Sequence, residues 1–232
     1  MKFDPHIHSL YSGDSKSSIE GILKTSMEKK MDVIAISDHD TIKGSKKAIE
    51  LSKKYKNIVV IPSIEITTTK GHILGLGVEE LIEKNLSPEE TIEKIHELNG
   101  LAIIPHPYTF YRHGLLTKVN YKDLKIDGLE TKNGRYILGY GNYKASKLLK
   151  TSKIAGLGAS DSHFLESIGD CYSEILINKD NDYDLENDNI IKEEILSAIK
   201  KNKVLAKGKG TSNILIFKEF INKKIKRKYK RN

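Results

Sequence analysis

Val33-Ile34-Ala35-Ile36-Ser37-Asp38-His39-Asp40 is the stretch from which the fold of this chain is most directly predicted. Its first four residues form a short apolar run of the kind that is buried in parallel sheets. Three ionisable residues end the stretch, and these are costly to bury unless their charges are paired or bound to a metal ion. We therefore expect a buried strand whose carboxyl end carries chemically active side chains.

Other apolar runs along the chain follow the same pattern. Buried strands are predicted at residues 58–61, 101–104 and 154–157, and a further strand is predicted at 127–130. Helices are predicted after the cap Ser18, after the capping box Ser87-Pro88-Glu89-Glu90, and at residues 143–153 and 189–201. This alternation predicts an α/β domain with a parallel sheet and crossover helices, either open or closed into a barrel.

Histidines and carboxylates gather at the ends of these runs, and six of the eight histidines belong to the series. In His6-Ile7-His8 the two histidines are two residues apart, so both rings face the same side of a strand. Asp161 and His163 repeat this spacing. Imidazole and carboxylate are ligands that suit zinc, manganese and iron. The series predicts a metal site with more than one ion, and therefore an enzyme.

The spread of these residues along the chain favours a closed barrel over an open sheet. They extend from residue 6 to residue 163 and follow successive strands. In a β/α barrel, the loops after the strands converge on one pocket at the carboxyl face. An open doubly wound sheet would instead concentrate its site at one switch point.

Composition and length are those of one soluble domain. The chain has 232 residues, a charged fraction of 30% and a mean hydropathy of −0.43. No apolar run approaches the roughly 18 residues needed to cross a bilayer, and the first residues lack the apolar stretch of a signal peptide. Cys171 is the single cysteine, which we expect to be a buried small hydrophobe. These features predict a cytoplasmic protein.

The motifs resemble those of the polymerase and histidinol phosphatase (PHP) domain family and occur in its order. The matching stretches are Asp4-Pro-His6-Ile-His8-Ser9, Ile36-Ser37-Asp38-His39-Asp40-Thr41, Glu65, Gly71-His72-Ile73-Leu74-Gly75, Pro105-His106-Pro107 and Ser160-Asp161-Ser162-His163. The resemblance runs from Lys2 to about Ile177. It implies a distorted (β/α)7 barrel of the PHP type with a metal-dependent phosphoesterase site. We accordingly expect one PHP catalytic domain over residues 1–217 and a basic tail over 218–232.

The resemblance also implies two or three divalent ions (zinc, manganese or iron) and divides their ligands into three sets. The first set is His6, His8, Glu65 and Asp161; the second is Glu65, His72 and His106; the third is Asp14, His39 and His163. Asp4 and Asp38 are expected to orient ligand imidazoles. For Asp4, capping of a turn is the alternative.

Such a site would hydrolyse a phosphomonoester, or a nucleotide or nucleic-acid phosphate, with a metal-activated water. His39 or His163 is expected to protonate the leaving oxygen if it is not fully committed to metal. Arg112 and Arg135 are the candidates for binding substrate phosphate, because a guanidinium contacts phosphate through two N–H groups. The alternative is that both arginines are solvated surface cations without a role in binding.

Three further groups have simpler expected roles. His96 is expected to be structural, and Tyr136, Tyr140 and Tyr143 are expected to pack in the core. The net charge of +8 reflects residues 218–232, which contain eight Lys or Arg and one Glu. Such a run is usually a solvated end, and contact with nucleic acid or with an anionic membrane is the alternative. The expected partners are thus a small phosphorylated substrate or nucleotide, with nucleic acid as a partner of the tail, whereas the oligomeric state is left open.

Two other functions are compatible with the same sequence. The first is a non-catalytic RNA-binding or scaffolding role. Some relatives, including the protein subunit of ribonuclease P that shares this fold, do not keep the full metal set. This chain keeps every ligand type at a suitable position, which favours an enzyme. The second is an amidohydrolase acting on carbon–nitrogen bonds, which usually relies on a carboxylated lysine or a different histidine order. The sequence indicates neither the carboxylated lysine nor the different histidine order.

Overall fold

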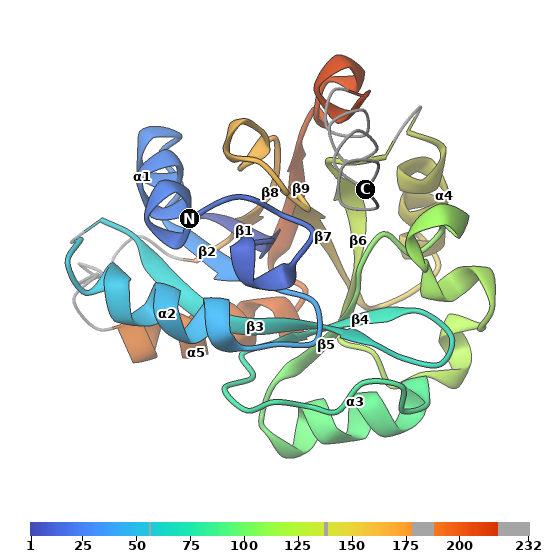
Figure 1. The fold of residues 1–232 in the computed structure, drawn as a ribbon. Helices are drawn as coiled ribbons and strands as arrows, with labels where there is room; N and C mark the ends of the chain where they lie inside the picture. Colours follow the sequence, from blue (N-terminus) through green and yellow to red (C-terminus); the bar gives the residue numbers. More distant parts are fainter. Residues whose placement is uncertain (56, 137–138, 178–187, 218–232) are drawn as a thin grey trace, which may run out of the picture.

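The structure is a computed structural model, which describes residues 1–55, 57–136, 139–177 and 188–217. The expectations for the polar stretch 178–187 and for the basic tail 218–232 concern residues outside these ranges. Within them, strands curve around a common interior and helices α1 to α4 lie on the outside (Figure 1). No helix in the described part of the chain is long and apolar enough to span a membrane.

Among the described residues, nine strands make up one sheet, in the order β7-β6-β5-β4-β3-β2-β1-β8-β9. Their bounds are β1 Lys2–Ile7, β2 Val33–Ile36, β3 Val59–Thr67, β4 His72–Leu76, β5 Leu101–Ile104, β6 Gly128–Asn133, β7 Ala155–Ala159, β8 Cys171–Ile175 and β9 Val204–Gly208. The helices are α1 Ile19–Glu28, α2 Lys43–Ser52, α3 Pro88–Glu97, α4 Tyr140–Leu149 and α5 Asp188–Lys200. Short 3₁₀ turns, labelled η, occupy several of the loops.

The sheet is nearly closed into a barrel because β7 returns to the strands at the other end of the order. Gly158 on β7 donates its N–H to the Ser173 hydroxyl on β8, 3.1 Å away. A side chain at Gly158 would collide with the carbonyl of Tyr172, so this close approach requires glycine. Beyond the strand, Ser162 pairs with Ile7 at the end of β1. The prediction of a barrel rather than an open sheet is therefore confirmed.

The prediction of a wholly parallel sheet is wrong. Strands β1, β2 and β3 are parallel, as are β5, β6 and β7, but β4 runs antiparallel to both of its neighbours. The chain passes from β3 to β4 through four residues, closed by a bond from Thr68 N–H to Gly71 O of 2.9 Å. So short a connection cannot cross over the sheet and must make a hairpin. The pairs β1–β8 and β8–β9 are antiparallel as well.

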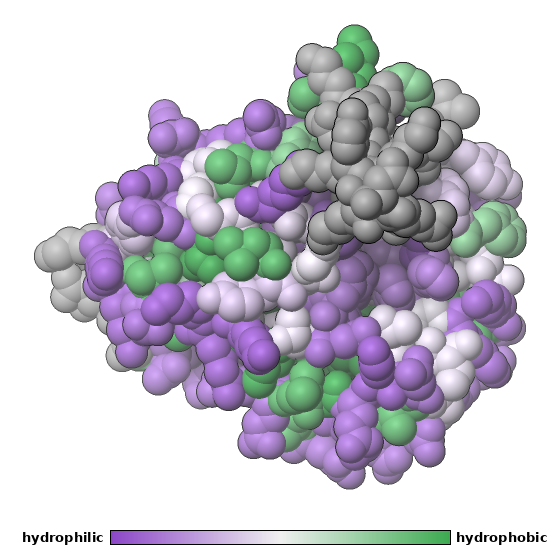
Figure 2. Space-filling model, in the orientation of Figure 1, coloured by the Kyte–Doolittle hydropathy of each residue, from purple (hydrophilic) through white to green (hydrophobic). Residues whose placement is uncertain are grey.

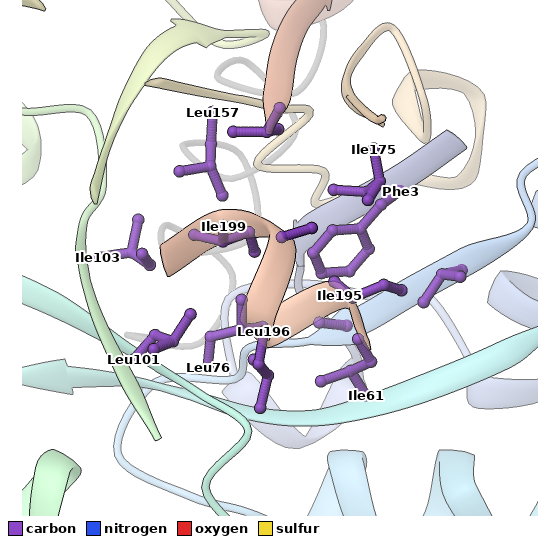
Figure 3. Close-up of a cluster of buried hydrophobic side chains, with 14 of the residues drawn as sticks. Phe3, Ile61, Leu76, Leu101, Ile103, Leu157, Ile175, Ile195, Leu196 and Ile199 are labelled. Carbon is purple, nitrogen blue, oxygen red and sulfur yellow. The ribbon is translucent and has the colours of Figure 1, made fainter. Parts of the chain in front are cut away.

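Three apolar clusters hold the layers together. Two of them pack helices onto the outside of the sheet, α1 and α2 against β1 to β3 and α3 and α4 against β3 to β6. The third lies inside the barrel, where Phe3, Ile61, Leu101 and other strand residues surround Ile195 and Ile199 of α5 (Figure 3). Helix α5 thus fills one end of the barrel.

The opposite end carries the loops that follow the parallel strands. It faces the viewer in Figure 1, with α5 behind the strands. In the same orientation, hydrophilic side chains border a hollow near the middle of this face (Figure 2).

Cys171 is buried as expected. By contrast, core packing is wrong for Tyr140 and Tyr143, which are 70% and 67% exposed because α4 begins at Tyr140 and turns this edge to solvent.

Candidate metal centre

An irregularity in β1 aims His6 and His8 into the barrel. The register pairs Asp4 with Ile34 and Ile7 with Ile36, so β1 has one residue more than β2 over this interval. Such a bulge shifts the in-and-out alternation by one position. Phe3 therefore belongs to the interior cluster, whereas Ile7 packs outside against α1 and α2. His6 and His8, on either side of Ile7, are fully buried on the interior side.

Glu65 is the centre of the buried cluster. It lies toward the carboxyl end of β3, and its backbone bonds to Asp38 and Asp40 in the loop after β2. Its Oε1 lies 2.8 Å from His72 Nδ1 and 3.0 Å from His106 Nε2. Its Oε2 lies 3.2 Å from His6 Nε2, His8 Nε2 and His39 Nδ1. Each carboxylate oxygen thus faces its own set of imidazoles.

Asp161 and His163 approach the same cluster from the loop after β7. Asp161 Oδ1 lies 3.7 Å from His8 Nε2 and 3.5 Å from His163 Nδ1. His163 Nε2 lies 2.6 Å from Asp14 Oδ2, and His39 Nε2 lies 4.0 Å from the same oxygen. All nine predicted ligands are therefore gathered at one end of the barrel.

Three groups have ligand atoms that all lie within 4.8 Å of one another. They are His6, His8 and Asp161; His39, Glu65 and His72; and His8, Asp14, His39 and His163. The grouping differs in detail from the sets that the resemblance implies. His8 and His39 each belong to two groups, and His106 reaches the cluster through Glu65. The assignment of ligands to individual ions stays a prediction.

Buried partners orient these rings. Glu130 on β6 places Oε1 2.8 Å from His6 Nδ1 and accepts the His106 backbone N–H on Oε2, also at 2.8 Å. The Ser12 hydroxyl donates to Asp14 Oδ1 at 2.7 Å, which leaves its oxygen to accept from His8 Nδ1, 3.2 Å away. Outer partners of this kind fix which imidazole nitrogen keeps its lone pair.

The donor set fits divalent cations. With Nδ1 of His6 and of His8 protonated, the Nε2 lone pairs of both rings point at each other across 2.9 Å. Glu65 Oε2 adds an acceptor 3.2 Å from each of these nitrogens. Lone pairs that face one another without a proton repel, and a cation among them removes the repulsion. Nitrogen and oxygen donors in this mixture suit zinc, manganese or iron.

The electrostatics of the cluster favour positive charge at its centre. Although burial lowers the pKa of His6, the carboxylates of Asp161, Glu65 and Glu130 raise it well above its usual value. Burial raises the pKa of Glu65, but His39, His72 and His6 hold it well below its usual range. The carboxylates thus favour a positive charge at His6, as expected beside a cation site, whereas burial lowers the pKa values of His39, His106 and His163.

His39 and His163, predicted as acid catalysts, favour the neutral form. Burial lowers the pKa of both imidazoles, and His8 and Arg135 lower that of His163 further. Neutral imidazole is the form that coordinates metal. Their proton-donating role stays a prediction.

Arg112 and Arg135 enter the site from the loops after β5 and β6. Arg112 Nη1 donates to Asp161 Oδ2 at 2.6 Å, and its Nη2 donates to Asn133 Oδ1 at 3.0 Å. Arg135 Nη1 lies 3.6 Å from Asp161 Oδ1. Each side chain is only 14% exposed, so both are part of the site rather than solvated surface cations. Binding of substrate phosphate by these groups stays a prediction.

Asp4 and Asp38 do not contact the imidazoles that they were expected to orient. Asp4 accepts backbone N–H groups of Ser160 and Gly169, at 3.0 and 2.9 Å. Asp38 accepts from the Ser9 N–H and hydroxyl. Both carboxylates hold the loops that carry the ligands, so the alternative of capping a turn describes Asp4 better.

Glu130 is the main residue that the sequence did not identify. It is fully buried, and its only sequence signal is a carboxylate inside the strand 128–133, as Glu65 is inside β3. A second irregularity, between Glu130 and Lys132, turns Asn133 to the same side. Asn133 then donates to Glu130 at 2.7 Å and to Asp161 at 3.0 Å. The expected structural role of His96 agrees with its 2.8 Å contact to Asp127, away from the cluster.

Comparison with known proteins gives the following matches. A family model described as the PHP domain matches residues 4–204. An uncharacterized protein of Methanocaldococcus jannaschii is 44% identical over 161 residues, which cover 65% of this chain and 92% of the relative. Another uncharacterized protein of that organism is 31% identical over 190 residues, covering 78% of this chain and 75% of the relative.

Among solved structures, one match is a two-domain protein of Bacteroides vulgatus that contains a predicted PHP-like metal-dependent phosphoesterase. It matches with a TM-score of 0.70 and 16% identity, over 90% of this chain and 64% of that one, so this chain spans less than two thirds of its length. At this identity the likeness concerns the fold, which is that of PHP-like metal-dependent phosphoesterases.

The family match includes every strand that carries a clustered side chain, from β1 with His6 to the loop after β7 with His163. It continues as far as Val204, where β9 begins. Sequence motifs, barrel and clustered side chains therefore agree, and this chain belongs to the PHP domain family.

Proposed function

We propose that this chain is a hydrolase that cleaves phosphate esters at a centre of two or three divalent ions. The observation that carries the proposal is the position of Glu65, whose two oxygens face separate sets of histidines. A carboxylate so placed is suited to bridge neighbouring ions. When bound, such ions would lower the pKa of a water molecule and neutralise charge on phosphate oxygens.

The protein groups would orient the ester and the ions. Glu130 and Ser12 hold the rings of His6 and His8 with Nε2 toward the cluster. Arg112 and Arg135 bring two fixed positive charges beside Asp161, where they would orient an ester phosphate. His39 and His163 are the candidates for giving a proton to the leaving oxygen. Phosphomonoesters and nucleotide or nucleic-acid phosphates are the substrate classes to test.

The test combines metal analysis with phosphate release by the purified full chain. Manganese, zinc and iron are added in turn to a panel of phosphomonoesters, dinucleotides and short RNA. Glu65→Gln keeps the size of the side chain but removes its charge, so we expect lost metal and release lowered about a hundredfold or more. His8→Ala and Asp161→Ala should act in the same direction.

The matched control is Glu89→Gln, on the exposed outer face of α3, which should leave both measurements unchanged. Phosphate release and metal content equal to wild type in Glu65→Gln would overturn the proposal. A metal-free protein that binds RNA and releases no phosphate would support the scaffolding alternative instead.

A further inference from the structure

Two exposed aromatic side chains stand beside the candidate metal centre. Phe110 is 86% exposed and Tyr111 is 63% exposed. Both belong to η2 (Phe110–Arg112), the turn that also carries Arg112. Full exposure of a phenylalanine contributes nothing to the core. A role outside folding is therefore indicated for this pair.

The other residues of the 109–113 loop are attached to the candidate ligands. The Thr109 hydroxyl lies 3.3 Å from His106 Nδ1, and Arg112 binds Asp161 at 2.6 Å. The ring of His113 stacks on that of His72, with centroids 5.1 Å apart. Successive residues of a 3₁₀ turn point about 120° apart. With Arg112 directed inward, Phe110 and Tyr111 are left at the edge of the site.

Helix α4 adds two more exposed rings next to this loop. The Tyr108 N–H donates to the Tyr136 hydroxyl at 3.0 Å, and Lys144 Nζ lies 4.3 Å from the centroid of the Tyr108 ring. One turn before Lys144, the helix carries Tyr140, with Tyr143 beside it. In Figure 1 the yellow-green turns of this loop adjoin α4. We call Phe110, Tyr111, Tyr140 and Tyr143 the aromatic rim.

The rim combines flat apolar faces with cations. Lys144 is exposed among the tyrosines, and Arg112 and Arg135 lie on the inner side, toward Asp161. Aromatic rings next to positive groups are the means by which proteins hold nucleobases and their phosphates. A sugar phosphate without a base would leave the rings uncovered.

We propose that the aromatic rim stacks the base of a nucleotide whose phosphate reaches the metal centre. The inference rests on the proposed function for the claim that this phosphate is cleaved. It adds the substrate class, namely a nucleobase-bearing phosphate ester. Phe110 and Tyr111, in the same turn as Arg112, supply the stacking faces tested below.

The experiment compares adenosine 5′-monophosphate with ribose 5-phosphate, which has the same phosphate and sugar but no base. We expect wild-type protein to favour the nucleotide in kcat/KM by about tenfold or more. Phe110→Leu keeps an apolar side chain but removes the ring, so the ratio of the two kcat/KM values should fall toward one. Phe110→Trp should keep or raise that ratio, and Tyr111→Ala should lower it.

The control is Leu81→Ala, which removes an exposed hydrophobic side chain in the loop after β4, at the α5 end of the barrel. It should leave the ratio as in wild type. Equal kcat/KM values for the two substrates in wild type, or equal ratios in Phe110→Leu and wild type, would overturn the inference.

Equilibrium dialysis of the full chain against both compounds separates this inference from the proposed function. If no ester of the panel above is hydrolysed, the proposed function fails, and tighter binding of the nucleotide that Phe110→Leu abolishes would still support base stacking. Phosphate release from both esters with equal binding would support the proposed function and overturn the inference.

Discussion

At the scale of single residues, Glu130 connects more of the candidate centre than its position in the sequence indicates. One oxygen faces His6 and the other accepts N–H groups from His106 and Asn133. Glu130→Gln offers only one acceptor oxygen, so one of these contacts must be lost. We expect metal affinity to fall about 10- to 100-fold with the fold retained.

A metal titration against a competing chelator measures this change, with circular dichroism to follow the fold. Glu174→Gln on β8, whose side chain is 44% exposed, is the matched control and should bind metal as wild type does. Wild-type affinity in Glu130→Gln would show that the carboxylate does not act through the ligands.

The residues of the candidate centre divide into those that sequence indicates and those that it does not. Histidines and carboxylates at strand ends are recognisable because strand ends meet at one face of a barrel. Ser12 and Thr109 each place a hydroxyl beside a ring nitrogen, of His8 and of His106. These contacts depend on the conformation of the loops, which the sequence pattern does not predict. His106 and Asp161 also adopt positive φ angles of 30° and 52°, a backbone state that no sequence pattern announces here.

At the scale of elements, the bulge in β1 determines which side chains face the interior. Deleting Pro5 restores the simple alternation and turns His6 and His8 away from Glu65. We expect the deletion variant to lose bound metal and to unfold at a lower temperature. Pro5→Ala keeps the residue count, so it should retain its metal. Metal analysis and thermal unfolding of both variants test this, and full metal content after the deletion would contradict it.

Element prediction succeeded where the local signals were strong. β2 and β5 coincide with their apolar runs, and α1 and α3 begin after Ser18 and Ser87, which cap them. α2 was not predicted, because its N-cap is Ile42, which makes no side-chain capping bond. The antiparallel strands β4, β8 and β9 are short and two of them are only partly apolar. β4 pairs with β3 through their short hairpin connection, whereas β8 pairs with β1, far away in the sequence, as the barrel closes. Local sequence does not encode the second pairing.

At the scale of the whole molecule, α5 closes the barrel end opposite the candidate centre. Ile199 is fully buried among strand side chains from several sides of the sheet. Ile199→Ala should therefore lower the free energy of unfolding by about 2–5 kcal/mol. Ile190→Ala, at a 52% exposed position of the same helix, should change it by less than about 0.5 kcal/mol. Urea titration measures both, and a stable Ile199→Ala protein would show that the plug is dispensable.

Because α5 fills one end of the barrel, it limits how a substrate can reach the candidate metal centre. With Ile195 and Ile199 packed against the strands, the described part of the chain gives the histidine cluster a solid floor. A molecule that binds at Glu65 would therefore enter and leave at the loop end, where η2 carries Phe110 and Tyr111. If the chain cleaves phosphate esters as proposed, inorganic phosphate that remains at this entrance would obstruct the next ester, so turnover would slow as product accumulates.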